Sequence, residues 1–511
     1  MSKTEGRTGK FIKNSLGQFM YQAILMVTGF ILPRVMLTYY GSQINGLVSS
    51  IGQFVSYFSL VEAGLSAATV YSLYKPLAED NHEKISSIVC AARNFYRQSG
   101  YIFFALVAIL AIVYPYVISP VADLTTLQIS ALVFVCSASG VLDFFILSKY
   151  RALFTADQKS YVISIAMMSA TISNVVIITG LAMAGQSILI TKAAALLSIL
   201  IKAVILVAYA RNNYSYINYN AVPEKQALNK RWDALFQQLL STVQLGAPTV
   251  ILTVITGDLA LVSVYAIYNM IASGIDSLLS IFVSGLAASF GEVIAKKETE
   301  TLKNAYKQFE TAYYLLISVV YTVAFIMIRP FVQIYTNGIT DADYLVPAYA
   351  VLFIMNGFFY NLKTPQGMLV LSAGLYKETR YRALTQGMIV VVVGCLLAQP
   401  FGIVGVLIGL ILSNVYRCID LLFFIPKNVT GVSPVYTLKH WLVMLSMVVG
   451  GILVAQTNIV QANNYIQWAG KAVVITLIAG CVAVVLFAII DYCNLKKVVE
   501  RCLNLISQKK R

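Results

Sequence analysis

The sequence predicts an all-α integral membrane protein with about 14 transmembrane helices. Of the 511 residues, 59% are hydrophobic and only 12% are charged, whereas about 25% of residues are charged in soluble globular proteins. The apolar residues form runs of about 20, the length that crosses about 30 Å of hydrocarbon at 1.5 Å per residue. Short polar turns, many of them basic, separate these runs. In such a chain the placement of the basic residues at the ends of spans matters more than the net charge of +15, because basic loops on one side set the orientation. We expect no nucleic-acid partner.

The first half of the chain contains six expected spans. The N-terminal residues imitate a signal peptide, but the first apolar run passes Leu32 without a small-residue cleavage site, so we expect an uncleaved first helix. The polar segment 75–99 is charged on one face and apolar on the other, which predicts a separate helix on the inner membrane surface. The six spans are expected at 15–36, 44–73, 100–119, 127–148, 161–183 and 187–210.

Eight further spans are expected after the longest polar connection, residues 212–238. They lie at 239–256, 259–290, 311–335, 346–372, 384–399, 402–425, 440–457 and 466–490. This layout predicts four parts. They are an N-lobe of helices one to six at 1–211, a cytoplasmic connection at 212–238, a C-lobe of helices seven to twelve at 239–425, and helices thirteen and fourteen with a basic tail at 426–511.

The distribution of basic residues predicts the orientation and disfavours an enzyme. With the N-terminus inside, the inner loops and tails hold about 30 of the 37 Lys and Arg, as the positive-inside rule requires. Both termini are then cytoplasmic. The outer turns are too short to build a catalytic domain, so we expect no catalytic residues and no cofactor. His82 and His440 are interpreted as loop or boundary residues, and no metal site is expected.

Two short echoes suggest an internal repeat. The second span ends with Gly64-Leu-Ser-Ala-Ala and the eighth with Gly285-Leu-Ala-Ala-Ser, while Leu153-Phe-Thr-Ala and Val370-Leu-Ser-Ala follow spans four and ten. Both echoes are six helices apart, and an even number of crossings keeps the copies parallel. The sequence therefore predicts two parallel six-helix lobes around a central cavity, with helices thirteen and fourteen as an addition.

Three segments carry a resemblance to a known family. Arg151 to Tyr161 (RALFTADQKSY) resembles the A-x-Q-K-x-Y turn of polysaccharide-transport proteins, and Gly257 to Tyr268 (GDLALVSVYAIY) is also similar to them. Phe401 to Gly409 (FGIVGVLIG) resembles their G-x-x-G-x-x-x-G entry to helix twelve. The family is the Wzx-type lipid-linked oligosaccharide flippases, within the multidrug/oligosaccharidyl-lipid/polysaccharide (MOP) exporter superfamily, whose fold is MATE-like.

The resemblance implies a function in the bacterial cytoplasmic membrane. It implies alternating-access transfer of an undecaprenyl-diphosphate-linked oligosaccharide unit from the inner to the outer leaflet, for a surface polysaccharide such as O-antigen or capsule. The implied partners are the lipid-linked glycan, membrane lipids, a polysaccharide polymerase and glycosyltransferases, with H⁺ or Na⁺ as an optional coupling ion.

Charged residues inside the spans are the candidate site residues, because each costs about 2.5 to 3.5 kcal/mol at a helix centre. Lys202 precedes Arg211 by nine residues, which places it about 13 Å above the inner boundary at 1.5 Å per residue. Lys363 precedes Ser372 by nine residues in the other lobe. We expect both ammonium groups to flank a hydrated cavity and bind an anionic headgroup.

Three further cations lie nearer the outer ends of their spans. Lys192, Arg34 and Arg329 are interpreted as a ladder that continues the substrate-binding site towards the outer leaflet. Arg34 and Arg329 adjoin Pro33 and Pro330 near span ends, so extension of their side chains to the membrane surface is the alternative.

The carboxylates Glu62, Asp143 and Asp276 have two alternative interpretations. They form intramembrane salt bridges with Lys202 and Lys363, or they bind a coupling proton or sodium ion. Arg417 and Asp420 are three residues apart on one helix and are expected to form a structural pair.

Two other functional classes remain open. A cation-coupled exporter of small drugs has the same two-lobe plan, and acidic residues dominating its cavity would favour it. A membrane glycan polymerase or ligase needs a sizeable outer loop for its chemistry, and the short outer turns disfavour that class.

Overall fold

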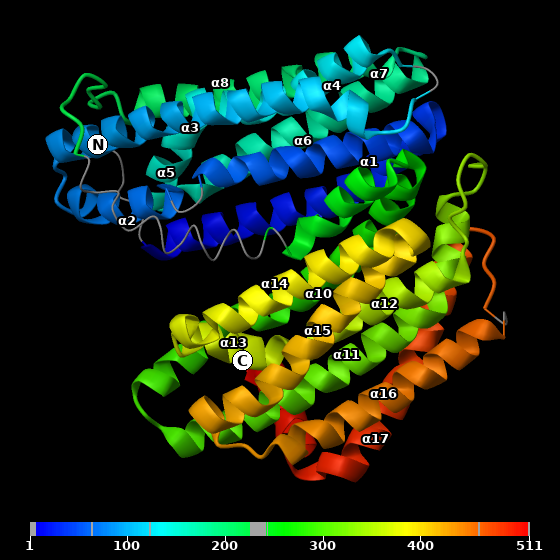
Figure 1. Cartoon of the computed structure of the whole chain (residues 1–511). Coiled ribbons are helices and arrows are strands. Elements are labelled where there is room, and N and C mark those ends of the chain that lie inside the picture. The colour runs from blue at the N-terminus through cyan, green and yellow to red at the C-terminus, as the bar shows by residue number, and fades with distance from the viewer. Residues whose placement is uncertain are drawn as a thin grey trace. The chain divides into compact units, whose positions relative to one another are not determined.

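The protein is built from helices and the turns that join them (Figure 1). The computed structural model describes residues 7–62, 65–121, 124–224, 242, 244–457 and 460–508. No strand occurs among these residues. Eleven of the described helices are long and apolar enough to cross a membrane. The first of them, Ile12–Glu62, contains the first expected span and most of the second, and the helices Gln244–Thr256 and α12 (Pro347–Leu362) are shorter. The all-α membrane fold with about 14 spans is confirmed.

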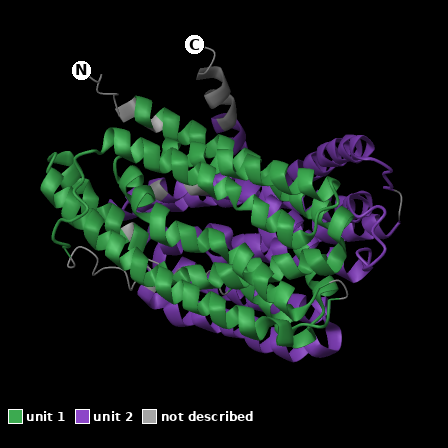
Figure 2. Cartoon of the chain, turned by 90° about the horizontal axis from the view of Figure 1, so that it is seen from above, with its two compact units in different colours: residues 1–266 green, residues 267–511 purple. Residues whose placement is uncertain are grey.

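The chain divides into two compact units, residues 1–266 and 267–511 (Figure 2). Most of the expected connection, residues 225–238, lies outside the described residues, as do 239–241 and 243 at the start of the expected seventh span. The four-part division expected from the sequence stays a prediction. Each unit is considered by itself below.

Unit 1 contains the first six expected spans. Its elements are α1 (Arg7–Phe58), the 3-10 turn η1 (Ser59–Glu62), α2 (Leu65–Ala78), α3 (His82–Val117), α4 (Thr126–Leu142), the π-helix η2 (Asp143–Leu147), α5 (Ser148–Ala156), α6 (Ser160–Met183), α7 (Ile188–Ala195), α8 (Leu197–Asn213) and the π-helix η4 (Leu252–Thr256). α6 packs against both α1 and α8.

Breaks in these helices have local causes. Gly41 divides α1 into two spans, because its φ of 80° is in the left-handed region that favours glycine. The π-helix η2 separates α4 from α5, and a single π-turn within an α-helix is often found at a functional site. The break at η2 begins at Asp143, one of the charged residues expected inside a span.

The polar segment 75–99 does not form a separate surface helix. α3 begins at His82 and continues without interruption to Val117, so most of the segment forms the first turns of a spanning helix. Its apolar face, which includes Ile85, Ile88 and Val89, is buried in the core of unit 1. The prediction of a separate helix was wrong because this face packs against protein.

The turn that carries the family resemblance joins several parts of unit 1. Asp157 Oδ2 lies 2.8 Å from Lys159 Nζ and accepts a 2.6 Å hydrogen bond from the hydroxyl of Tyr214, which follows α8. Asn14 of α1 donates from Nδ2 to the backbone oxygen of Gln158 at 2.8 Å. Burial and the hydrogen bond to Asp157 raise the pKa of Tyr214. The turn therefore fastens the ends of α1, α5 and α8 together.

Unit 2 contains most of the eighth expected span and all of spans nine to fourteen, whereas the described part of the seventh span lies in unit 1. Its elements are α10 (Leu259–Ala295), most of which lies in this unit, α11 (Thr299–Tyr335), α12 (Pro347–Leu362), α13 (Thr364–Ser372), α14 (Tyr376–Phe401), α15 (Ile403–Ile425), the π-helix η5 (Pro426–Thr430), α16 (Pro434–Gln456) and α17 (Tyr465–Gln508). α11 packs against α12, α16 and α17.

Two glycines bring α14 and α15 close together. A Cβ atom added to Gly405 would lie 2.0 Å from the backbone oxygen of Leu397, and one added to Gly409 would lie 2.9 Å from the backbone nitrogen of Gly394. Only hydrogen fits at these positions. The glycine pattern of the family-like segment thus serves helix packing, as small residues do in membrane proteins.

Candidate functional site

Five of the eight candidate site residues lie in two polar clusters, one inside each unit. Both clusters are at breaks in apolar helices. In unit 1 the break is η2, which begins at Asp143. In unit 2 the break is Lys363, which separates α12 from α13. Pro365 follows two residues later, and because proline has no N–H, it interrupts the helical hydrogen-bond ladder.

Unit 1 brings three of the candidates together around η2. Lys202 of α8 is 7% exposed, and its Nζ lies 2.6 Å from Asp143 Oδ1. Glu62 Oε1 lies 3.5 Å from Arg151 Nη2. The Ser148 hydroxyl links the two pairs, since it lies 3.0 Å from the backbone oxygen of Asp143 and 3.3 Å from Glu62 Oε2. Of the two alternatives for the carboxylates, the salt bridge is the one present for Asp143.

This arrangement balances the charges of unit 1. Two cations and two anions form adjacent pairs, so the cluster is close to neutral. Burying an ion pair is costly, and the mutual attraction recovers that cost only when geometry and hydrogen bonds are good. Substrate binding by Lys202 and ion coupling by Glu62 and Asp143 stay predictions.

Unit 2 holds Asp276 of α10 in a network of neutral side chains. Its Oδ1 accepts a 2.6 Å hydrogen bond from Asn361 Nδ2 and a 3.3 Å bond from the Tyr321 hydroxyl. Asn361 Oδ1 in turn accepts a 3.0 Å hydrogen bond from the Tyr313 hydroxyl. Asn361 is 3% exposed, so this amide is a buried link between α10, α11 and α12.

The ammonium of Lys363 also contacts neutral side chains. Its Nζ donates to Asn414 Oδ1 of α15 at 2.5 Å and lies 4.7 Å from the centre of the Tyr360 ring. Asn414 Nδ2 donates to Asn356 Oδ1 at 2.9 Å. Among the residues that the structure describes, no carboxylate lies within 4.0 Å of the ammonium of Lys363. An ammonium has three N–H donors, so Lys363 keeps capacity for an anion.

The deep lysine therefore has a different kind of partner in each unit. In unit 1 the lysine is neutralised by a carboxylate at hydrogen-bond distance. In unit 2 the lysine contacts an asparagine and an aromatic ring. The carboxylate of Asp276 accepts a hydrogen bond from a different asparagine, Asn361. Lys363 is consequently the stronger candidate for binding an anionic ligand.

The three outer cations lie on separate helices. Lys192 on α7 and Arg34 on α1 are partly buried, while Arg329 on α11 is exposed. Substrate binding by these residues, and the ladder they would form, stays a prediction. The pair of Arg417 and Asp420 is confirmed, with Nη1 and Oδ2 separated by 2.7 Å.

Sequence analysis missed the neutral partners of these charges. Asn361 and Asn414 determine how Asp276 and Lys363 are held, but an asparagine in an apolar run carries little signal. It also missed Glu310 and Asp491, whose carboxylates lie in spanning helices. Their ionisable side chains in apolar runs were a readable signal.

Searches of family models and of curated protein sequences found no match. Solved structures do resemble the chain. The lipid II flippase MurJ in an inward closed conformation has a TM-score of 0.68 with 13% sequence identity, covering 93% of this chain and 99% of its own. An inward-facing multidrug resistance MATE transporter of the MOP superfamily has a TM-score of 0.56 with 16% identity, covering 83% and 95%.

A third structure is a MOP superfamily transporter from Pyrococcus furiosus, whose title reports a binding pocket of reverse polarity. It has a TM-score of 0.54 with 13% identity, covering 86% of this chain and 96% of its own. These similarities extend over most of each chain. The chain therefore has the fold shared by these MOP superfamily transporters, and it is a multi-pass membrane protein.

Proposed function

We propose that this chain is a flippase that moves an undecaprenyl-diphosphate-linked oligosaccharide from the inner to the outer leaflet of a bacterial cytoplasmic membrane, by alternating access. Its termini are then cytoplasmic, and its partners are glycosyltransferases and a polymerase of a surface polysaccharide. The fold shared with a lipid II flippase supports the transport class. Lys363 carries the assignment of an anionic substrate, because its ammonium has no carboxylate partner among the described residues.

A flippase is needed because the headgroup does not cross hydrocarbon unaided. Removing water from each hydroxyl costs about 4 to 8 kcal/mol on the alkane scale, so a few sugars meet a barrier of tens of kcal/mol. A cation that is held by neutral side chains offers a diphosphate an ionic partner without first breaking a salt bridge. Lys363 would bind the diphosphate in this way, and Tyr360 and Asn414 would keep its ammonium in place.

The membrane potential contributes to the driving force in this proposal. Moving one negative charge outward across an inside-negative membrane gains about 2.3 kcal/mol per 100 mV. Coupling to H⁺ or Na⁺ is then optional. If transfer in vesicles does not respond to an imposed potential at fixed ion gradients, this part of the proposal is wrong.

The test uses the Lys363→Gln variant, with Lys496→Gln as the control. Lys496 is exposed on α17, with 61% of its side chain accessible. We expect undecaprenyl diphosphate to raise the thermal unfolding temperature of the wild type and of the control. The rise in Lys363→Gln should be at least ten times smaller. Undecaprenol, which has no charge, should affect all three proteins equally.

Glycan appearance at the outer surface of cells provides the second measurement. Export should fall in Lys363→Gln at normal protein levels and recover in part in Lys363→Arg, which retains the charge. Normal export in Lys363→Gln removes this residue from the site.

A cation-coupled drug exporter is the second candidate, since a MATE transporter shares the fold. The carboxylate of Asp276 is the observation that favours it, because an acidic group held by neutral donors suits a cationic ligand. In that case lipophilic cations, and not the lipid diphosphate, would stabilise the protein, and Asp276→Asn would abolish the effect.

A further inference from the structure

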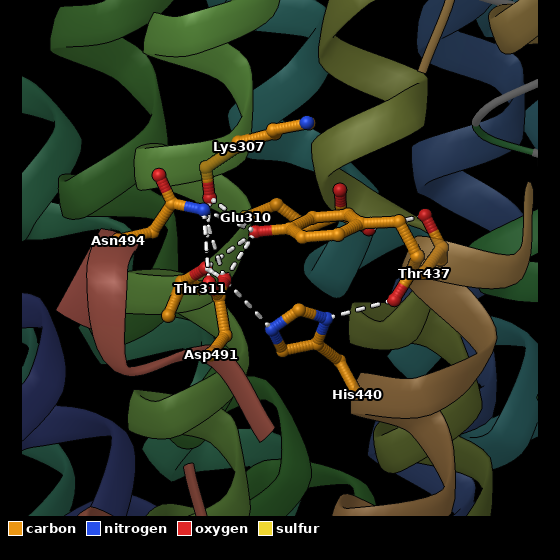
Figure 3. A network of polar contacts seen from close by, with 8 residues as sticks. Lys307, Glu310, Thr311, Thr437, His440, Asp491 and Asn494 are labelled. Atoms are coloured by element: carbon orange, nitrogen blue, oxygen red, sulfur yellow. Dashed lines mark hydrogen bonds and ion pairs between the residues drawn. The ribbon is translucent and has the colours of Figure 1, made fainter. Parts of the chain in front are cut away.

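A buried polar network occurs where α11, α16 and α17 meet, outside both clusters described above (Figure 3). Glu310 of α11 is 0% exposed and His440 of α16 is 1% exposed. The interpretation of His440 as a loop or boundary residue was wrong, because it lies inside α16 with its ring among protein side chains. The third helix contributes Asp491, whose side chain is 9% exposed.

Both carboxylate oxygens of Asp491 accept hydrogen bonds from neighbouring side chains. The Tyr436 hydroxyl donates to its Oδ2 at 2.5 Å, and the Thr311 hydroxyl lies 2.9 Å from the same oxygen. Asn494 Nδ2 donates to Oδ1 at 3.0 Å. His440 Nε2 lies 3.5 Å from Asp491 Oδ2. Asp491 also interrupts α17 with non-helical angles, φ −144° and ψ 56°. This carboxylate therefore has the partners that a permanent negative charge requires.

Glu310 has far fewer hydrogen-bond partners than Asp491. Its Oε1 accepts one hydrogen bond, at 2.6 Å, from the Thr437 hydroxyl. Its Oε2 is buried and has no hydrogen-bond partner among the described residues. His440 Nε2 is the second buried atom of the network without a hydrogen bond. A buried carboxylate with one donor and an unoccupied oxygen is poorly suited to a permanent charge.

We propose that Glu310 and His440 form a proton-binding site that holds one exchangeable proton where α11, α16 and α17 meet. A proton from water forms an O–H bond at Glu310 Oε2 or an N–H bond at His440 Nε2, and its release returns the pair to the ionised carboxylate and the neutral imidazole. Asp491 stays ionised in both states, because its oxygens accept the hydrogen bonds of Tyr436 and Asn494.

The surroundings of the pair contain few competing charges. The titratable groups that face it are Tyr306, Lys307 and Tyr314 of α11, Tyr436 of α16 and Asp491 of α17. The ammonium of Lys307 lies over the Tyr436 ring, 5.2 Å from its centre, and points away from Glu310 and His440 (Figure 3). The proton is therefore the variable charge of this junction.

Proton binding changes how three helices attract one another. Glu310, His440 and Asp491 each come from a different helix, and the hydrogen bonds between Thr437 and Glu310 and between Tyr436 and Asp491 also join helices. Gaining or losing one charge here changes the electrostatic balance that holds α16 and α17 on α11. The site thus links proton binding to the packing of the two C-terminal helices. This link does not depend on which substrate is carried.

Infrared difference spectroscopy of the full-length protein in phospholipid vesicles tests the site, from about pH 4 to about pH 8, which covers ordinary carboxyl and imidazole titration. We expect the wild type to show a C=O stretching component of a desolvated, protonated carboxyl that disappears as one group ionises. Glu310→Gln should lack this component. The control is Glu292→Gln, whose exposed side chain pairs with Lys296, and it should retain the component.

A second variant and a second measurement keep the test independent of one substitution. Thr437→Val removes only the donor to Glu310, so the midpoint of the component should move. Hydrogen–deuterium exchange, corrected for the intrinsic effect of pH, should show pH-dependent protection in residues 434–456 of the wild type and constant protection in Glu310→Gln.

Identical pH responses of the wild type and Glu310→Gln in both measurements would overturn the proton site. No lipid-linked substrate is used, so this failure is separate from failure of the proposed transport function. Conversely, loss of lipid diphosphate binding by Lys363→Gln would leave the spectra of the Glu310 site unchanged.

Discussion

Lys202 Nζ and Asp143 Oδ1 are 2.6 Å apart, and the carboxylate of this pair stands at the first residue of a π-helix. The π-turn and the lysine come from different helices, η2 and α8. A charge that would be costly in each helix alone is thus balanced by its neighbour. This relationship makes the contribution of either residue dependent on the other.

The first prediction concerns this pair. Lys202→Met and Asp143→Asn each leave one uncompensated buried charge, so each should destabilise the protein by about 3 to 5 kcal/mol. The loss of stability in the double variant should be clearly smaller than the sum of the losses in the two single variants. Thermal unfolding in detergent, carried out as a double-mutant cycle, measures the coupling. Additive losses would mean that the two side chains do not interact in solution.

The second prediction concerns the contact between α14 and α15. Gly405→Ala places a methyl group 2.0 Å from the backbone oxygen of Leu397. Because backbone atoms cannot move aside cheaply, we expect a loss of about 1 to 3 kcal/mol. Gly387→Ala on α14 is the control, since nothing lies within 4 Å of its added Cβ. Equal unfolding temperatures for the two variants would contradict the close packing.

The third prediction concerns the amide that holds Asp276. Asn361→Leu removes the 2.6 Å hydrogen bond to Asp276, and a bond to a charged group contributes about 1.5 to 3 kcal/mol. The same change at Asn304, which is exposed on α11, should have little effect. Adding Asp276→Asn to Asn361→Leu should restore part of the lost stability. No recovery would show that Asp276 is neutral in the folded protein.

The fourth prediction is a pH dependence at Tyr214. Its pKa in the folded protein is raised by burial and by the hydrogen bond to Asp157. The unfolded chain therefore loses this proton at lower pH than the folded chain does, so the stability that the tyrosine contributes is complete below about pH 10 and falls as the pH rises further.

Comparison with Tyr214→Phe measures this contribution. At neutral pH the wild type should be more stable by about 1 to 3 kcal/mol, because the variant loses a hydrogen bond to a charged group. The difference between the two unfolding temperatures should shrink above about pH 10. A constant difference across that range would mean that Tyr214 titrates alike in the folded and unfolded chains.

The sequence by itself determined the class of the protein and at least one end of most spans. Apolar runs must become helices in a membrane, because no water is present there to satisfy the backbone, and this requirement is local. The expected span 161–183 and α6 (Ser160–Met183) agree closely for this reason. The pairing of Arg417 with Asp420 was also predictable, since both residues lie on one helical surface.

Tertiary structure alone decided which charges on different helices meet. Lys202 and Lys363 look equivalent in sequence, at similar depths in two apolar spans, yet one lies against Asp143 and the other against Asn414. The depth of a charge follows from its position along one helix. Its partner is set by the rotation and packing of several helices, to which residues far apart in the chain contribute. For the same reason the network of Glu310, His440 and Asp491 became visible only once α11, α16 and α17 were in contact.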